Sequence, residues 1–139
     1  MSPGAIPSIP PIPGLDGKNE FTDSTSIADG KALEKVIPKY TSAAVIGAGA
    51  IGVEITLALV AKGYHRVYLL DMLENILPAS LDKDMAGRVE PAMRKRGVEL
   101  ILSANILSIE NEIERKRVIL PDRELDVDLI FLTTGARPN

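Results

Sequence analysis

Short apolar runs separated by polar or glycine-rich turns set the pattern of this chain. Residues 43–46 are continuously apolar and pass directly into a glycine-rich turn, as is typical of a parallel strand buried on both faces. A helical pattern follows as far as Lys62 and is stopped by Gly63. A second apolar run, residues 67–70, ends in Asp71. The order strand, glycine turn, helix, strand predicts one βαβ unit.

A second helix is predicted over residues 82–96. Acidic residues lie in its first turn and basic residues in its last turn, which suits the helix dipole, and Gly97 is a fitting residue just beyond its end. Its apolar positions recur every four residues, at Met85, Val89 and Met93. Pro91 is expected to kink or split the helix because it removes a helical hydrogen bond. Residues 98–102 then predict a third strand.

The pattern changes after residue 102, where the apolar runs become short and are separated by polar turns. These runs cover residues 106–110, 117–120, 125–126 and 129–132. No room remains for another crossover helix, and short connections imply antiparallel neighbours, so we predict a β-meander packed against the parallel sheet. The last run, Asp128–Leu132, is apolar enough to return to the central sheet. The predicted fold class is therefore α/β: a Rossmann-like parallel sheet flanked by helices, with a β-meander replacing the last crossover.

The N-terminal segment is rich in proline. Five prolines between Ser2 and Gly14 fix φ and remove amide donors, so this segment cannot join a helix or a central strand. We interpret it as an extended connector, in preference to a proline-rich ligand for a partner. Residues 14–17 predict a turn, and residues 29–37 predict a short helix ended by Pro38.

Bulk properties narrow the function classes. At 139 residues the chain is about the size of one domain. A net charge of −3 and a pI near 5.2 argue against a nucleic-acid partner or an anionic membrane surface. The chain has no cysteine, hence no disulfide and no thiolate metal site. Because we find neither a secretory signal nor an apolar stretch near the roughly 20 residues of a membrane span, a cytoplasmic location without membrane contact is expected.

The turn at residues 47–52 matches the pattern GxGxxG, and each glycine has a physical role. The first allows a tight turn, the second lets the backbone approach a phosphate, and the third lets the helix pack closely on the strand. Phosphate oxygens then meet the free amides and the positive dipole end of the helix that begins near Ala50. Because the pattern follows a buried strand and opens a helix, it favours a dinucleotide site over a tight turn with a helix cap.

Asp71 favours NADH as the dinucleotide. It lies about 20 residues beyond the turn, where a carboxylate accepts hydrogen bonds from the adenosine ribose hydroxyls. The 2′-phosphate of NADPH would bring negative charge beside Asp71 and Glu74, and residues 71–78 contain no Arg or Lys to neutralise it. NADH is therefore expected to bind in preference to NADPH, although Lys83 could reach back from the next helix and reduce the preference.

Glu54 is the only charged residue between Gly47 and Ala61. Two roles remain equally open for it: an interaction with the helix dipole, or a polar contact near the nicotinamide end of the cofactor. The remainder of the helix is apolar on two faces, so we expect it to be covered on both sides.

Other polar candidates are weaker. His65, the only histidine, is expected to be a solvated turn residue and not a metal ligand, because no cysteine or second histidine accompanies it. The basic triplets 94–96 and 115–117 are interpreted as a helix C-terminus and a hairpin turn and not as basic patches.

Further segments resemble the FAD-dependent pyridine nucleotide-disulfide oxidoreductases. Residues 128–139 closely resemble the apolar strand and (A/T)TGxxPN motif that close the pyridine-nucleotide domain of that family, and residues 10–15 resemble the stretch where the chain leaves the FAD domain. Residues 47–54 are similar to its GxGxxGxE fingerprint. Residues 81–84 are similar to the branch that holds NADH oxidases, NADH peroxidases and coenzyme A-disulfide reductases.

This resemblance implies a fold of the FAD/NAD(P)-binding domain type. Residues 1–14 would be a connector from a missing FAD domain, and residues 15–139 the NAD(H)-binding domain. The parent protein would be a homodimer, joined by a C-terminal dimerisation domain, in which hydride passes from nicotinamide C4 to flavin N5. This chain has neither the FAD fingerprint nor a redox cysteine, so it is expected not to bind FAD alone and to be inactive without the FAD domain.

Site residues follow from the turn, the acid and the resemblance. By resemblance Glu54 positions the nicotinamide and its ribose, and the backbone around Thr134 and Gly135 passes close to the nicotinamide. Ser80 stands where many relatives have an aromatic gate, and Asn75 replaces a frequent arginine. The candidate cofactor-binding residues are Gly47, Gly49, Ala50, Ile51, Gly52, Glu54, Asp71, Met72, Ser80, Thr134 and Gly135. No catalytic residue and no metal ligand is assigned.

Three functions compete for this pattern. The first is the NADH-binding domain of an FAD-dependent oxidoreductase, presenting nicotinamide to flavin. The second is a stand-alone NAD-sensing module, and the third is a Rossmann-like methyltransferase that uses S-adenosylmethionine, since its strand-end acid also holds a ribose. Residues 133–139 favour the first, because neither alternative requires this ending. The sequence does not indicate the terminal electron acceptor.

Overall fold

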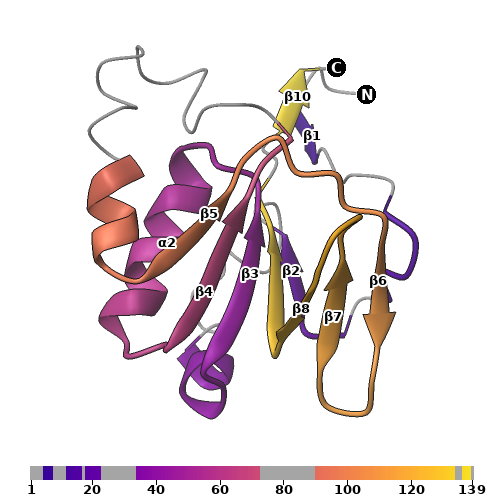
Figure 1. Ribbon diagram of the computed structural model, residues 1–139, viewed down its shortest axis with the longest axis horizontal. Helices are drawn as coiled ribbons and strands as arrows, with labels where there is room; N and C mark the ends of the chain where they lie inside the picture. The colour runs from indigo at the N-terminus through magenta and orange to yellow at the C-terminus, as the bar shows by residue number, and fades with distance from the viewer. Residues whose placement is uncertain are drawn as a thin grey trace.

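The computed structural model describes residues 5–7, 12–16, 18–22, 34–72, 90–133 and 136–138. Within this part of the chain the strands form a five-stranded parallel sheet, a three-stranded antiparallel sheet and a two-stranded ribbon (Figure 1). The order of the central sheet is β2-β9-β3-β4-β5. Its strands are β2 (Glu20–Thr22), β9 (Leu129–Leu132), β3 (Ser42–Ile46), β4 (Arg66–Leu70) and β5 (Val98–Ile101).

The predicted βαβ unit is confirmed. Strand β3 leads through the glycine turn into helix α2 (Ala50–Ala61), and β4 then pairs with β3 in parallel, with Ala44 opposite Tyr68. The helix ends at Ala61; the amide of its C-cap residue, Lys62, donates to the carbonyl of Ala58, and Gly63 follows with a φ of +95°. Gly63 therefore has the left-handed conformation expected of a residue that terminates a helix.

The predicted β-meander is also confirmed. Strands β6 (Ser108–Asn111), β7 (Lys116–Ile119) and β8 (Glu124–Val127) pair as antiparallel neighbours. Only Asp128 separates β8 from β9, which returns to the central sheet in parallel with β3. The Asp128 carboxylate accepts hydrogen bonds from the amides of Thr41 and Ser42, at 3.1 and 3.3 Å. These bonds fix the point where the chain crosses from the meander to the central sheet.

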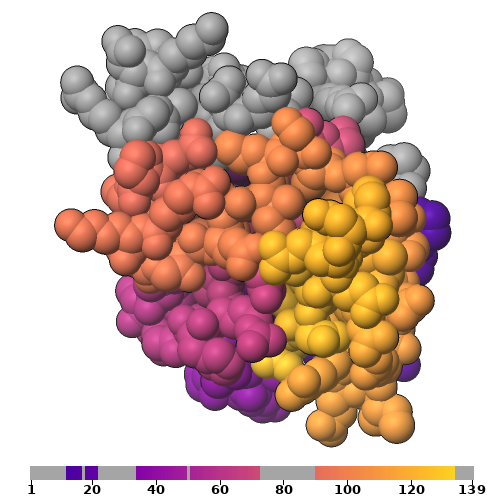
Figure 2. All heavy atoms as spheres, viewed as in Figure 1, coloured from indigo at the N-terminus to yellow at the C-terminus, as the bar shows by residue number. Residues whose placement is uncertain are grey.

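Successive residues of the central strands enter two separate cores. Ala43, Val45 and Phe131 point to the face covered by α2, whereas Ala44, Ile46 and Ile130 point to the face covered by the meander. In Figure 1 the helix and the meander accordingly lie on different sides of the central strands. The space-filling view of the same face shows the yellow residues beside the magenta residues, which lie at the lower left (Figure 2). The fold is therefore a three-layer arrangement of helices, parallel sheet and antiparallel sheet.

Helix α2 receives cover mainly on one side. Val53 and Leu59 are buried in the core beneath the helix, and Ile55 and Leu57 pack partly against it. Ile51, at the start of the helix, remains 42% exposed. The expected cover on the second side is therefore absent around Ile51 among the described residues.

Part of the proline-rich segment is paired with a segment near the end of the chain. Its residues Ala5–Pro7 form the extended strand β1, which pairs antiparallel with β10 (Ala136–Pro138), a pairing that was not predicted. Each strand of a two-stranded ribbon pairs on one side only, so fewer of its amides have to donate hydrogen bonds than in a central strand. The ribbon therefore tolerates proline at its ends. The carbonyl of Pro13 also accepts the amide of Ile109, at 2.8 Å, and ties the end of this segment to the meander.

Two further elements were missed or misread. Strand β2, at the edge of the central sheet, was not predicted; its Phe21 ring stacks on Phe131, with centroids 5.6 Å apart.

Pro38 does not end the helical segment, because residues 34–36 are helical and a 3-10 helix continues over Ile37–Lys39. Proline is accepted in the first turn of such a helix, where its missing amide has no helical partner.

The second predicted helix is described only at its C-terminal end. Residues 90–95 are helical, and Gly97 follows with a φ of +95°. Met93 is buried in the same core as the residues beneath α2. Residues 73–89, with Met85 and Val89, lie outside the described residues. The kink at Pro91 therefore stays a prediction.

A buried ion pair joins the N-terminal part of the chain to the meander. The side chain of Lys116 is only 4% exposed, and its ammonium group donates to Asp16, Glu20 and Asn111 at 2.8, 2.7 and 2.6 Å. All three of its donors are thereby used. The hydrogen bond from Lys116 is the main reason that the pKa of Asp16 falls to about 2. Lys116 thus holds β2 and the segment before it against β7.

The neighbouring cations confirm that residues 115–117 are not a basic patch. Arg117 lies among four carboxylates, with Glu112 and Asp126 at 2.8 and 3.0 Å. Arg115 closes the hairpin turn, where its carbonyl accepts the amide of Glu112.

We expect K116M to lower the free energy of unfolding by about 3 kcal/mol, because it leaves the buried carboxylate of Glu20 without its counter-ion. Urea denaturation at neutral pH measures this loss. R115M is the matched control: it removes an exposed cation from the adjacent position and should change stability by no more than about 0.5 kcal/mol. Equal losses in the two variants would contradict the assigned role of Lys116.

Candidate cofactor-binding site

The carboxyl ends of three adjacent strands lie at the candidate site. Gly47 follows β3, Asp71 follows β4 and Thr133 follows β9, and β3 lies between the other two strands. From β3 the chain builds β4 and β5 to one side, whereas β9 and β2 lie on the other side. Ligands of open α/β sheets bind outside the carboxyl ends of the strands at such a switch point.

The first glycine of the turn adopts a conformation that favours glycine. Gly47 has a φ of +115°, in the region that side chains with a Cβ rarely enter. Its amide donates to the carbonyl of Leu70 at 2.7 Å, so the turn is attached to the end of β4.

The third glycine brings the helix against the turn. A Cβ placed on Gly52 would lie 1.9 Å from the carbonyl oxygen of Gly47 and 2.7 Å from the hydroxyl oxygen of Thr133. No side chain fits in that space. The predicted role of the third glycine in close packing therefore agrees with the geometry.

The second glycine faces open space. A Cβ on Gly49 would meet nothing within 4 Å, and its φ of −78° is accessible to other residues. Neither strain nor crowding in the protein therefore requires glycine here. The open space beside Gly49 instead leaves room for a ligand to lie directly against the backbone of the turn.

The N-terminus of α2 offers backbone donors that have no acceptor within the helix. Gly49 is the N-cap and provides no side-chain cap, and the first helical bond runs from the amide of Val53 to Gly49. The preceding helical amides, those of Ala50, Ile51 and Gly52, lie before this bond and have no acceptor within the helix. With the helix dipole they form a favourable environment for an anion.

Asp71 lies directly beside the turn, as the sequence predicts. Its carboxylate accepts the amide of Ala48 at 2.7 Å, across 23 residues of sequence. The adjacent Met72 side chain is 75% exposed. A strand-end carboxylate therefore lies within one hydrogen bond of the turn, and an exposed apolar side chain follows it in the chain.

Glu54 lies on the exposed side of α2, beyond the first turn, which contains no acidic residue. An interaction with the helix dipole is weak at this distance from the N-terminus because the effect fades within the first turn. The second role considered for Glu54, a polar contact near the nicotinamide end of the cofactor, stays a prediction.

Thr133 is a neighbour of the turn that sequence reasoning missed. It is 3% exposed, its amide donates to the carbonyl of Ile46 at 2.8 Å, and its hydroxyl donates to the carbonyl of Gly47 at 2.8 Å. In the sequence Thr133 is only the first residue of the family motif that follows the last strand, and nothing there relates it to a turn 86 residues earlier.

Three of the candidate residues, Ser80, Thr134 and Gly135, lie outside the described residues. Their predicted roles, and the effect of Ser80 in place of an aromatic gate, stay predictions. Ala50 is described only as the first helical residue.

Two expectations about other chemistry can be compared with the described part of the chain. His65 is exposed in the turn before β4, as expected. Among the described residues no group of three or more His, Asp or Glu side chains could hold a metal ion, and no helix is long and apolar enough to cross a membrane.

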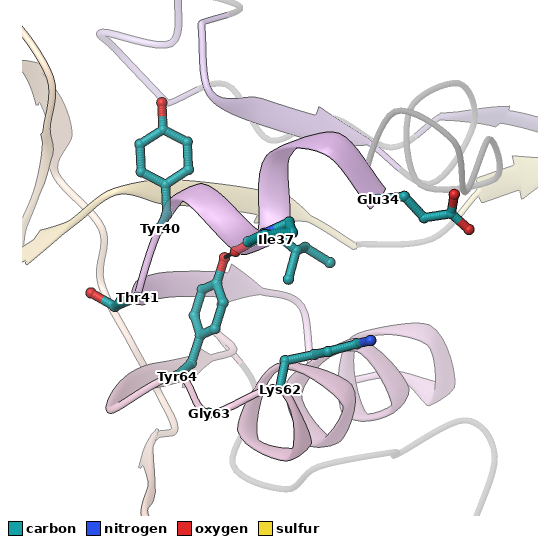
Figure 3. Close-up of a pocket in the computed structure, with 8 residues that line it drawn as sticks. Glu34, Ile37, Tyr40, Thr41, Lys62, Gly63 and Tyr64 are labelled. Carbon is teal, nitrogen blue, oxygen red and sulfur yellow. Dashed lines mark hydrogen bonds between the residues drawn. The ribbon is translucent and has the colours of Figure 1, made fainter.

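A separate hollow of about 570 Å³ lies near the opposite ends of the strands, between the 3-10 helix and the end of α2 (Figure 3). Its lining includes Tyr64, whose hydroxyl donates to the carbonyl of Ile37 at 2.9 Å, and Lys62. Burial raises the pKa of Tyr64 to about 12. The described residues bring no constellation of chemical groups to this hollow comparable to that at the glycine turn.

Comparison with protein families and curated proteins gives a consistent result. The family described as pyridine nucleotide-disulphide oxidoreductase matches residues 1–139. An NADH oxidase of Methanocaldococcus jannaschii is 37% identical over all of this chain, which covers 31% of that protein. An NAD(P)H coenzyme A polysulfide/persulfide reductase of Pyrococcus horikoshii is 32% identical over 98% of the chain and 30% of that protein. The chain thus spans about a third of the length of these relatives.

Solved structures give the same picture. A water-forming NADH oxidase from Lactobacillus brevis, bound to NADH, matches with a TM-score of 0.87 and 29% identity, over 98% of this chain and 30% of that one. An engineered NADPH oxidase derived from it, bound to NADPH, matches with the same TM-score and 27% identity, again over 98% and 30%. Its five substitutions remove one aspartate and introduce two arginines.

We expect G52A to lower the free energy of unfolding by about 3 kcal/mol, because its methyl group would overlap the carbonyl of Gly47 and force helix and strand apart. G49A is the control, with open space around the new methyl group, and should cost about 1 kcal/mol or less. Urea denaturation compares the two variants. If G52A were as stable as G49A, the close contact assigned to Gly52 would be wrong.

Proposed function

The chain belongs to the pyridine nucleotide-disulphide oxidoreductase family, and from this premise we propose that it is the NADH-binding domain of an FAD-dependent oxidoreductase. The observation that supports this most directly is the turn at the end of β3. It combines an open approach at Gly49, amides at the start of α2 that have no acceptor within the helix, and the Asp71 carboxylate within one hydrogen bond of the turn.

In this proposal the pyrophosphate of NADH lies over Gly49. Its oxygens accept hydrogen bonds from the amides of Ala50, Ile51 and Gly52, where the dipole of α2 favours negative charge. Asp71 accepts the hydroxyls of the adenosine ribose, and Met72 lies against the adenine side of the cofactor. The exposed position of Met72 suits an apolar contact with a ring system.

The nicotinamide end would extend along the carboxyl ends of the strands. Glu54 would position the nicotinamide and its ribose from α2, and the backbone at Thr134 and Gly135 would border the ring. Bound NADH supplies a hydride from its nicotinamide to the flavin of the parent protein. The role of this chain is to hold and orient the cofactor.

A larger parent is part of the proposal. The chain spans about a third of the length of its curated relatives, which leaves room for an FAD domain and a C-terminal dimerisation domain. Strands β1 and β10 pair with each other, so the chain enters and leaves this domain at one place. That arrangement suits a domain inserted between two segments of an FAD domain, in a parent that forms a homodimer.

We propose NADH and not NADPH as the preferred cofactor. The position of Asp71 beside the turn places a negative charge where the 2′-phosphate of NADPH would lie. The engineered relative bound to NADPH, which has lost one aspartate and gained two arginines, is consistent with this charge argument.

The stand-alone NAD-sensing module remains the alternative, because it would need the same turn and the same acid. Turnover by the full-length parent, which would include the FAD domain, distinguishes the two. The family match gives no support to the methyltransferase alternative.

We expect calorimetric titration to show that NADH binds the chain and that G49A weakens this binding by about tenfold or more, because the added methyl group occupies the phosphate approach without crowding the protein. The purified chain should contain no flavin and should not oxidise NADH by itself. An S-adenosylmethionine titration serves as the control. Binding of that compound alone, or NADH oxidation by the chain without flavin, would overturn the proposal.

We also expect NADPH to bind about tenfold or more weakly than NADH, and D71N to reduce this difference. Asparagine keeps an oxygen acceptor for the amide of Ala48 while removing the charge that repels a 2′-phosphate. D122N is the charge-matched control at an exposed position in the turn before β8. If D71N left the ratio of the two dissociation constants unchanged, Asp71 would not determine the cofactor preference.

A further inference from the structure

We infer that Thr133 is a positioning residue for the glycine turn: its hydroxyl fixes the peptide between Gly47 and Ala48 and thereby the orientation of the phosphate-binding amides. This inference deepens the proposed function and rests on it. Thr133 lies outside the set of residues expected to contact the cofactor.

One peptide unit of the turn is held at both of its polar ends. Its carbonyl oxygen, on Gly47, accepts the hydroxyl of Thr133 at 2.8 Å. Its amide, on Ala48, donates to the carboxylate of Asp71 at 2.7 Å. The two partners come from the ends of β9 and β4, on opposite sides of β3. A rotation of this peptide plane would break both bonds together.

The hydroxyl of Thr133 acts separately from its backbone. The Thr133 amide already donates to the carbonyl of Ile46 at 2.8 Å, which places the main chain at the end of β9. The hydroxyl has one proton to donate, and the oxygen of Gly47 is nearer to it than that of Ile46, at 2.8 against 3.3 Å. Removing the hydroxyl alone should therefore release the turn while leaving the strand pairing in place.

Water cannot readily replace the hydroxyl. Thr133, Gly47 and Ala48 are all buried, so the Gly47 carbonyl would lose this hydrogen bond in a dry environment, which is unfavourable. Rotation of the peptide that turns the Gly47 carbonyl toward another donor would relieve that loss. It would also withdraw the Ala48 amide from Asp71 and change the direction in which the chain enters Gly49, the N-cap of α2.

Thr133 also links the phosphate-binding part and the ribose-binding part of the proposed site. Asp71 would bind the ribose, and its orientation depends in part on the Ala48 amide. That amide is oriented by the same peptide whose carbonyl binds Thr133. Loss of the hydroxyl should therefore affect both the phosphate-binding amides and the ribose-binding carboxylate, although Thr133 itself contacts neither the phosphate nor the ribose.

The test compares T133V, which replaces the hydroxyl by a methyl group of similar size, with T133S, which keeps the hydroxyl. T133V should weaken NADH binding by about tenfold, and T133S should bind within about twofold of the original chain. T56V is the matched control, because Thr56 is a buried threonine whose hydroxyl donates to the carbonyl of Gly52 at 2.7 Å, within α2. It should bind NADH within about twofold of the original chain.

A second measurement needs no cofactor. Amide hydrogen exchange of Ala48, followed by NMR in the ligand-free chain, should be about tenfold faster in T133V and unchanged in T133S. Should T133V fail to fold, T133A replaces it in both measurements. An unchanged NADH affinity and unchanged Ala48 exchange in the variant without the hydroxyl would overturn the inference, as would a loss of stability with unchanged affinity. If the original chain binds no NADH, the proposed function fails, and Ala48 exchange alone decides the role of Thr133 in the turn.

Discussion

The approach of α2 to the end of β3 is the constraint on which the candidate site depends. Gly52 lies so close to the carbonyl of Gly47 that a single methyl group would not fit between them. This contact allows the helix to begin directly at the end of the strand. Its N-terminal amides therefore face the open space beside Gly49. Without it, the backbone donors and the strand-end carboxylate of Asp71 would not share one small region.

The two cores leave this region accessible. Alternate residues of the central strands are buried against α2 on one face and against the meander on the other. Such burial on both faces stabilises the sheet, and no described residue crowds the position of a Cβ on Gly49, at the carboxyl ends of the strands. Proteins with parallel sheets place ligands at this edge for the same reason. The meander completes the second core without adding a crossover helix that would lengthen the domain.

Polar groups in the interior fix the connections between layers. Lys116 satisfies its three donors on Asp16, Glu20 and Asn111, and Asp128 holds the crossing from β8 to β9. Thr133 performs the equivalent task at the turn. Each of these residues joins segments that are far apart in sequence. The layers are therefore held in register by a few directional bonds as well as by apolar packing.

The sequence alone determined the βαβ unit, the meander, the roles of Gly47 and Gly52 and the placement of Asp71 beside the turn. These features follow from local periodicity, from the conformational freedom and small size of glycine, and from the rule that the carboxyl ends of parallel strands lie at one end of the sheet. Only the tertiary structure decided the pairing of β1 with β10, the edge strand β2, the burial of Lys116 and the contact of Thr133 with Gly47. Each of these unites segments about 85 to 130 residues apart, where the partner is chosen by three-dimensional packing and leaves no periodic trace in the chain.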